Sequence, residues 1–294
     1  MKTKQIAIIS GKGGTGKTTL AGSLGVLFDN HIIADCDVDA SNLQLILKPK
    51  ILKTLQYKAG HKAQINENKC IGCGKCQQVC RYNAIHRKDT DKYTVDPFAC
   101  EGCKACVLVC PTKAVDFVLN HPGDYYVSDT QYAPFVHAEL KPGEEMSGGL
   151  VAQVRKLALK MAVDERKEFV IIDGAPGIGC PATSSLTGTD YAILVTEPTV
   201  SGIHDMRRMI ELIEHFKIPY SIVINRFDLN IEKTLEIEDL CKSKTIRMMG
   251  KIPFDKQVNV ANSNEYPIVE NGDSLAAKSI KEIYSRLMER LDQI

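Results

Sequence analysis

Two groups of residues in this sequence have the side-chain types and the spacing that chemistry requires. Eight cysteines form two runs of the pattern C-x-x-C-x-x-C-x-x-x-C, and the second run repeats the first thirty positions further along. Cysteine thiolates are soft ligands that select iron–sulfur clusters or zinc. The second group, Gly11 to Thr18, fits the pattern G-x-x-x-x-G-K-S/T, which is typical of loops that bind nucleotide phosphates. The sequence therefore predicts thiolate-bound metal and bound phosphate in one chain.

The glycine-rich loop lies between an apolar, strand-like run at residues 5–10 and a helix-like run at 17–28, which is the context such a loop requires. Successive backbone N–H groups and the helix N-terminus attract phosphate oxygens. Lys17 offsets charge on the β- and γ-phosphates, and Thr18 can bind Mg²⁺. The loop residues that we expect to contact nucleotide are Gly11, Lys12, Gly13, Gly14, Thr15, Gly16, Lys17, Thr18 and Thr19.

The elements that must position these groups alternate in type over both ends of the chain. Apolar, β-branched runs alternate with segments in which apolar residues recur every three or four positions, as a parallel sheet covered by helices requires. We expect strands at residues 5–10, 31–35, 169–173, 191–196 and 220–225. We expect helices at residues 17–28, 148–162, 205–215 and 274–291. The predicted fold class is α/β, with a doubly wound, mostly parallel sheet.

Residues 60–119 break this alternation with short segments and with the repeat that contains the eight cysteines. Such a unit folds around its metal rather than around a large apolar core. We therefore predict a small domain at 60–119 inserted into a larger domain formed by 1–59 and 120–294. Zinc motifs usually pair two C-x-x-C knuckles across a longer gap, so three closely spaced cysteines favour clusters, with a pair of Cys₄ zinc sites as the alternative.

The composition limits which partners and compartments are expected. The chain has 294 residues, of which 44% are hydrophobic and 25% charged, as in a soluble globular protein. A formal net charge of +1 gives no global argument for nucleic acid or an anionic membrane. We expect a cytoplasmic protein, because no signal peptide or spanning segment is visible, and a C-terminal helix that packs in the domain rather than anchoring it to a membrane.

Each cysteine run resembles that of bacterial two-cluster ferredoxins, in which the first three thiolates hold one 4Fe-4S cluster and the fourth crosses to the other. The resemblance implies a small α+β ferredoxin-like domain with two 4Fe-4S clusters. It assigns one cluster to Cys70, Cys73, Cys76 and Cys110. It assigns the other to Cys100, Cys103, Cys106 and Cys80. The first run departs from the pattern, because Arg81 rather than proline follows its fourth cysteine.

The segment Lys12 to Thr19 resembles the deviant P-loop of the MinD, ParA and nitrogenase iron-protein superfamily. The resemblance implies a P-loop NTPase fold and a homodimer held together by ATP. It also implies that Lys12 reaches the phosphates of the nucleotide bound by the facing subunit, as an arginine finger does. By the same resemblance, Lys12 and Lys17 are the two catalytic lysines.

Further segments resemble the nucleotide-sensing parts of this superfamily, in the same order along the chain. Asp37, after the second predicted strand, would position or deprotonate the attacking water. Asp173, at the end of an apolar strand, would lie near Mg²⁺, and Gly177 would lie near the γ-phosphate. The resemblance places Asn225 and Pro253 on the adenine side of the nucleotide.

Together these resemblances imply a slow, Mg²⁺-dependent, partner-stimulated ATPase in which dimer closure is coupled to electron transfer through two clusters. The redox partner is not identified by the sequence. An alternative is an ATP-dependent carrier or assembly factor for a metal–sulfur cluster, and a third is a spatial organiser of the MinD or ParA kind. One hypothesis places Cys180 near its copy at the dimer axis as a metal ligand, whereas Cys36 and Cys241 are expected to be structural.

Overall fold

The structure is a computed structural model that describes residues 2–144 and 147–294, and these residues divide into two compact units. The sheet unit comprises the chain up to Leu55 together with Tyr125–Glu139 and Ser147–Ile294. The cysteine unit comprises Gln56–Asp124 and the segment that begins at Leu140. It is thus wider than the predicted insertion.

Side-chain contacts explain why the segment that begins at Leu140 belongs to the cysteine unit. Glu144 accepts hydrogen bonds from the ammonium of Lys62 at 2.6 Å and from Asn120 at 3.0 Å. Sequence patterns do not reveal such polar contacts between distant positions. The sequence alone therefore predicts that residues 140–144 belong to the larger domain.

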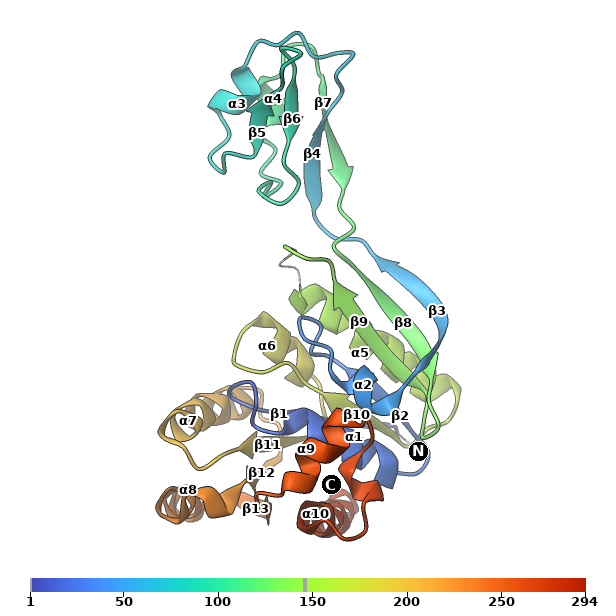
Figure 1. Cartoon of the computed structure of the whole chain (residues 1–294), viewed down its shortest axis with the longest axis vertical. Helices are drawn as coiled ribbons and strands as arrows, with labels where there is room; N and C mark the ends of the chain where they lie inside the picture. The colour runs from blue at the N-terminus through green and yellow to red at the C-terminus, as the bar shows by residue number, and fades with distance from the viewer. Residues whose placement is uncertain (1, 145–146) are drawn as a thin grey trace. The chain divides into compact units, whose positions relative to one another are not determined.

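The sheet unit is built on nine strands within the described residues, in the order β13-β12-β11-β1-β10-β2-β9-β8-β3 (Figure 1). The strands are β1 (Lys4–Ile9), β2 (His31–Asp35), β3 (Lys50–Tyr57), β8 (Gly123–Asp129), β9 (Phe135–Leu140), β10 (Phe169–Asp173), β11 (Tyr191–Thr196), β12 (Tyr220–Asn225) and β13 (Arg247–Ile252). All pairs from β13 to β9 are parallel. Parallel pairing brings the carboxyl ends of β1, β2 and β10 to one edge, where ligands of open α/β sheets bind.

The five strands predicted from apolar runs are confirmed as β1, β2, β10, β11 and β12. In β10, the consecutive residues Val170, Ile171 and Ile172 are all fully buried. Neighbouring strand residues point to opposite faces of a sheet, so helices cover both faces here.

The helices of the sheet unit include all four that the sequence predicts, as α1, α5, α7 and α10. The described helices are α1 (Lys17–Leu27), α2 (Leu43–Leu47), α5 (Ser147–Asp164), α6 (Cys180–Leu186), α7 (Val200–His215), α8 (Ile231–Ser243), α9 (Lys256–Ser263) and α10 (Leu275–Leu291), with 3₁₀ turns η1 (Phe227–Leu229) and η2 (Ile268–Glu270). Helix α7 starts before the predicted residue 205 because Thr199 caps it, accepting the N–H of Gly202 at 2.9 Å. No helix among residues 2–144 and 147–294 has the length and apolar character needed to span a bilayer.

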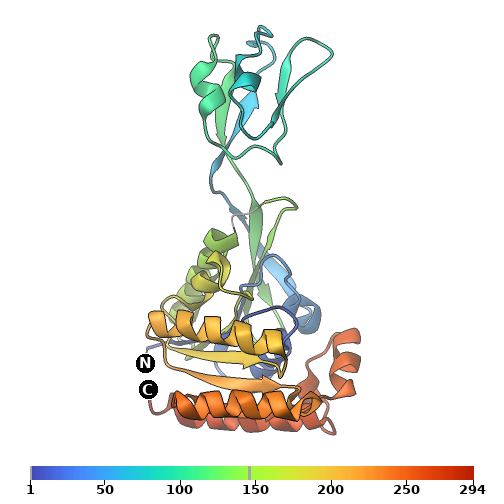
Figure 2. The same ribbon diagram turned by 90° about the vertical axis from the view of Figure 1, so that its left-hand side faces the viewer.

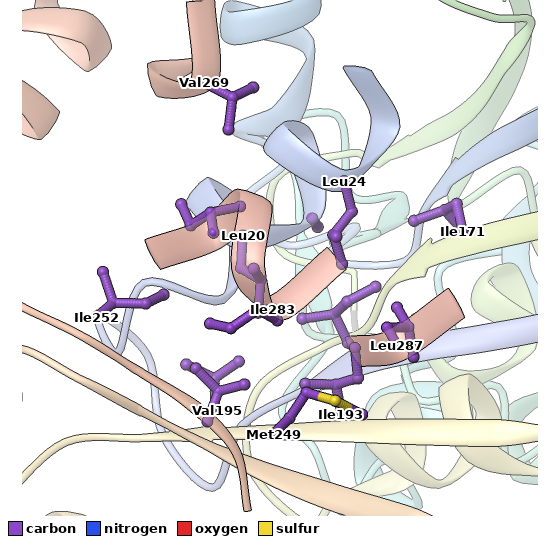
Figure 3. Close-up of a cluster of buried hydrophobic side chains, with 14 of the residues drawn as sticks. Leu20, Leu24, Ile171, Ile193, Val195, Met249, Ile252, Val269, Ile283 and Leu287 are labelled. Carbon is purple, nitrogen blue, oxygen red and sulfur yellow. The ribbon is translucent and has the colours of Figure 1, made fainter. Parts of the chain in front are cut away.

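A large hydrophobic cluster lies where α1 and α10 meet the sheet. Figure 3 shows Leu20 and Leu24 of α1 with Ile283 and Leu287 of α10, packed around strand residues such as Ile193. Helix α10 therefore packs in the domain, as the sequence analysis predicts (Figure 2).

Strand β13 is an element that the sequence patterns missed. Its residues, Arg-Met-Met-Gly-Lys-Ile, lack the β-branched run that predicts a strand. Gly250 permits close packing of α10, because a Cβ atom there would lie 2.5 Å from Cγ1 of Ile283. Tertiary packing thus specifies this strand.

The cysteine unit contains two short antiparallel strand pairs and two one-turn helices. Strand β4 (His61–Ile65) pairs antiparallel with β7 (Val115–Leu119), and β5 (Ile85–Arg87) pairs antiparallel with β6 (Tyr93–Val95). The helices are α3 (Lys75–Gln78) and α4 (Ala105–Val109). Its core has six buried members: Ala63, Cys76, Ile85, Tyr93, Cys106 and Val115. A core this small, with two cysteines in it, depends on more than apolar burial.

Candidate functional site

The glycine-rich loop connects β1 to α1 and turns at two left-handed glycines. Gly14 and Gly16 have φ angles of 78° and 91°, which other residues adopt only with strain. A Cβ atom on Gly16 would lie 2.2 Å from Nδ2 of Asn225, and one on Gly11 would lie 2.5 Å from a backbone oxygen of α7. A Cβ atom on Gly13 or Gly14 would meet nothing within 4 Å. The loop backbone is thus tightly held on one side and open on the other, as phosphate binding requires.

Lys17, the first residue of α1, is the centre of a buried charge cluster. Its Nζ lies 2.7 Å from Oδ1 of Asp173, 3.7 Å from Oδ2 of Asp37 and 3.4 Å from the hydroxyl oxygen of Thr18. Burial by itself lowers the pKa of Lys17, but the carboxylates of Asp173, Asp35 and Asp37 outweigh burial and raise the pKa above its ordinary value. The structure therefore brings together the residues predicted to handle phosphate, Mg²⁺ and water.

The donor set beside Lys17 fits Mg²⁺. Oδ2 of Asp173 is buried and has no hydrogen-bond partner among the described residues. Thr18 supplies a hydroxyl to the same region. Mg²⁺ prefers such oxygen ligands and shares them with substrate phosphates.

Asp35, the last residue of β2, belongs to this site although the sequence analysis assigned it no role. Its carboxylate accepts the N–H of Asp37 at 3.0 Å and the hydroxyl of Ser41 at 2.8 Å. Burial and the neighbouring Asp173 raise the pKa of Asp35 to about 7. The D-x-D pattern was the available signal, but only its second aspartate was assigned.

A cavity of about 660 Å³ opens beside the loop. Its lining includes Gly13, Gly14, Gly16, Lys17, Thr18, Thr19 and Asp37. A smaller cavity contains Asn225 and Pro253 and shares Gly16 and Thr19 with the first. The two adjoining cavities offer space for phosphates at the loop and for a base beside Asn225.

Five of the residues predicted to act on the nucleotide line neither cavity: Gly11, Lys12, Thr15, Asp173 and Gly177. Asp173 is connected to the first cavity through its ion pair with Lys17, which lines that cavity. Gly177 has a φ angle of 81° and donates its N–H to the backbone oxygen of Ser10 at 3.0 Å. This bond joins the segment after β10 to the end of β1.

Lys12 is held by its own chain. Its Nζ lies 2.6 Å from Oε1 of Glu197 and 2.9 Å from the hydroxyl oxygen of Ser201. The other carboxylate oxygen of Glu197 lies 3.3 Å from Arg226. Sequence reasoning missed Glu197, because a single glutamate after a strand gives no signal of this contact.

The eight clustered cysteines line two separate small cavities, with four cysteines in each. Cavity A is lined by Cys70, Cys73, Cys76 and Cys110. Cavity B is lined by Cys100, Cys103, Cys106 and Cys80. Each cavity takes three cysteines from one run and the fourth from the other run, which is the grouping that the ferredoxin resemblance implies.

Several sulfur atoms accept backbone N–H groups, which stabilises thiolates. These bonds run to Cys110 from Ala114 at 3.2 Å, to Cys80 from Ala84 at 3.4 Å and to Cys100 from Ala63 at 3.5 Å. In the part of the chain that the structure describes, no three His, Cys, Asp or Glu side chains are grouped closely enough to hold a metal ion.

Two glycines of the cysteine runs have a conformational role that the sequence analysis overlooked. Gly72 and Gly102 precede the second cysteine of each run and have φ angles of 73° and 61°. A Cβ atom on Gly72 would lie 2.5 Å from the backbone oxygen of Asp91, and one on Gly102 would lie 2.1 Å from that of His61. The repeat itself was the signal, since it places glycine at the same position twice.

The remaining three cysteines lie outside these cavities. Cys36 and Cys241 are buried, as expected for structural residues, and Cys180 is exposed at the start of α6. Whether Cys180 binds metal with its copy stays a prediction.

Comparisons with known proteins agree with the geometry of the sheet unit. Residues 6–268 match the family described as the CobQ/CobB/MinD/ParA nucleotide binding domain. The uncharacterized protein MJ0578 of Methanocaldococcus jannaschii is 35% identical over 288 residues, covering 97% of this chain and 96% of that protein. An iron–sulfur cluster carrier protein of Pyrococcus furiosus is 28% identical over 159 residues, covering 50% of this chain and 54% of that protein.

A solved structure supports the same fold. The septum site-determining protein MinD of Pyrococcus horikoshii, complexed with Mg-ADP, has a TM-score of 0.58 at 19% identity and covers 97% of this chain and 96% of that one. The family match includes the glycine-rich loop, both aspartate segments and Asn225. This chain therefore belongs to the CobQ/CobB/MinD/ParA family of nucleotide-binding domains.

Proposed function

We propose that this protein binds and hydrolyses ATP, holds two 4Fe-4S clusters, and couples closure of an ATP-bound homodimer to electron transfer. One observation carries the proposal: a chain of a nucleotide-binding family also contains two cavities, each lined by four cysteines drawn from both runs. The presence of both features in one chain favours a coupled activity.

The nucleotide half of the proposal rests on the charge cluster around Lys17. The loop N–H groups and Lys17 bind the β- and γ-phosphates, and Thr18 holds Mg²⁺ with Asp173 nearby. Asp37, whose carboxylate faces Lys17 at 3.7 Å, orients the attacking water. The Mg-ADP complex of the related MinD supports this choice of ligand.

The cluster half rests on the fit of the two cysteine cavities. Cys70, Cys73, Cys76 and Cys110 would hold one cluster, and Cys100, Cys103, Cys106 and Cys80 the other. Each bound cluster would supply a one-electron redox centre. Four protein thiolates for each cluster favour resident cofactors over labile ones.

Chain order supports coupling between the two halves. The segment after β2 carries Asp37 and leads through α2 into β3, which continues into the cysteine unit; the chain returns through β8. A continuous stretch of backbone thus links Asp37 to the cysteine unit, and we propose that a change on nucleotide binding is transmitted along it.

The proposed dimer assigns a second state to Lys12. To reach the nucleotide of a facing subunit, its ammonium must leave Glu197, which holds it at 2.6 Å. The contact with Glu197 therefore favours the open monomer, and nucleotide phosphate competes with it.

A second candidate function is the delivery of a metal–sulfur cluster. The Pyrococcus furiosus relative is named an iron–sulfur cluster carrier protein, and about half of it matches this chain. Cys180, exposed at the start of α6, is the thiol that such a role would use. A delivered cluster must leave the protein, whereas a redox cofactor stays bound.

Anaerobic purification with iron and sulfide counts, followed by EPR with and without Mg-ATP, tests the proposal. We expect about eight iron atoms per chain and EPR signals that Mg-ATP changes in the wild type but not in Lys17→Gln. EPR signals that are the same with and without Mg-ATP would refute coupling. Loss of iron to an apo-acceptor only with ATP, abolished by Cys180→Ser, would instead support the carrier.

A further inference from the structure

The surface around cavity A carries unpaired positive charge. Three exposed lysines lie within three residues of its cysteines: Lys69, Lys75 and Lys113. Lys75 lines the cavity itself. None of the three forms an ion pair within residues 2–144 and 147–294. Their charge is therefore available to a partner.

Two acidic side chains beside cavity A are paired with cations. Glu67 is paired with Lys88, and Asp91 with Arg87 at 2.9 Å. Asp91 is close to the cavity, because its backbone oxygen faces Gly72. Within three positions of the cavity A cysteines, the three lysines are therefore the unpaired charges among the described residues.

Cavity B has a different balance of charge. Glu101, which is exposed and forms no ion pair in the described residues, lines it together with Lys104. The ammonium of Lys104 lies 5.6 Å from the centre of the Phe117 ring, and Arg81 is exposed after Cys80. Two cations and one carboxylate at cavity B compare with three unopposed cations at cavity A.

Cavity A also exposes what an electron-transfer contact requires. Ile71, part of the cavity lining, is 63% exposed, and Cys73 is exposed two residues later. An exposed apolar side chain among cations is typical of a protein–protein contact, in which a small apolar centre is surrounded by a charged rim. Phosphate backbones need the cations but not Ile71.

We propose that the cavity A surface, defined by Lys69, Ile71, Lys75 and Lys113, docks an acidic one-electron carrier protein. The proposal rests on the proposed function, because the electron exchanged there would be held by a cluster bound at cavity A. In each exchange the carrier loses one electron and this protein gains one, or the reverse, and no covalent bond forms or breaks.

Binding of flavodoxin, an acidic one-electron carrier, to the anaerobically loaded full-length protein tests this inference by calorimetry at low ionic strength. The test variant is Lys69→Glu/Lys75→Glu, and the matched control is Lys104→Glu at cavity B. We expect the test variant to weaken binding about tenfold or more and the control less than about threefold. Ile71→Ser should weaken binding without changing its salt dependence, because it removes no charge.

Iron and sulfide counts on each variant separate the possible failures. Preparations without clusters would refute the proposed function, and the docking inference with it. Loaded variants that bind flavodoxin equally well, or a larger loss for Lys104→Glu, would overturn the docking inference alone. So would binding of duplex DNA at the same salt that is tighter than binding of flavodoxin and is lost in Lys69→Glu/Lys75→Glu.

Discussion

Replacing Lys17 by methionine should destabilise the nucleotide-free protein far more than the same substitution at Lys12. Methionine retains most of the length of lysine and removes only its charge. Both lysines lie in the same loop region and both pair with carboxylates, but Lys17 and its nearest partner, Asp173, are both buried. The comparison therefore isolates the contribution of burial to a charge cluster.

The magnitude follows from the distances. At an effective dielectric constant of about 20, charges 2.7 Å apart attract by about 6 kcal/mol, and charges 3.7 Å apart by about 4.5 kcal/mol. Desolvation of Lys17 cancels much of this attraction, but removing one partner leaves buried carboxylates uncompensated, at a cost of about 3–5 kcal/mol. The same substitution at Lys12, whose side chain is 28% exposed, should lower the unfolding free energy by about 0–1 kcal/mol.

The assay is guanidinium denaturation of the apo protein, followed by far-ultraviolet circular dichroism at pH 6 and pH 8. Equal slopes against denaturant would show that the same transition is compared. The loss of unfolding free energy in Lys17→Met, relative to wild type, should be larger at pH 8 than at pH 6. Without the ammonium, the clustered carboxyl groups of the folded protein bind protons more readily, so the folded state of the variant is more stable at low pH.

A loss below about 1 kcal/mol for Lys17→Met, or a loss equal to that for Lys12→Met, would refute the electrostatic reasoning. A loss that grew toward pH 6 would contradict the pH argument specifically. Far-ultraviolet spectra of both variants without denaturant provide the control for folding.

Three further predictions concern single carboxylates and one cysteine. The pKa of Asp35 is raised from 3.8 to about 7, so its contribution to stability is present at low pH and lost as pH rises through 7; Asp35→Asn should remove this loss, and parallel melting-temperature profiles of variant and wild type over pH 4–8 would contradict it. Asp37→Asn should keep Mg-ATP affinity within about threefold while phosphate release falls about 10²-fold or more, and unchanged turnover would exclude its role. Cys76→Ser should halve the iron count, from about eight to about four per chain, whereas Cys180→Ser should leave it unchanged.

The sequence predicted the parts of this protein that local patterns encode. Strands such as β10 were predictable because a run buried on both faces is continuously apolar, and the loop at Gly11 to Thr18 because phosphate binding fixes its glycines. Contacts between distant positions were not predictable. Glu197 meets Lys12 only through the order of strands in the sheet, and Asp35 acquires its raised pKa only when Asp173 is packed beside it.

Domain boundaries illustrate the same limit. Repeated cysteines gave the position of the insertion, but its edge at 140–144 depends on Glu144 pairing with Lys62, which lies 82 positions earlier in the sequence. Strand β13 depends on Gly250 meeting α10. Both features are decided by packing, which a one-dimensional pattern does not contain.

Strand β1 has a consequence for the order in which the protein matures during synthesis. Its partners in the sheet are β10 and β11, so Lys4 can pair with Phe169 only after Phe169 has left the ribosome. At synthesis rates of about 5–20 residues per second, that delay is roughly 10–30 s. Both cysteine runs emerge during this interval. The cysteine unit is therefore fully synthesised before the nucleotide site, so under the proposed function its clusters can be inserted before ATP regulates the protein.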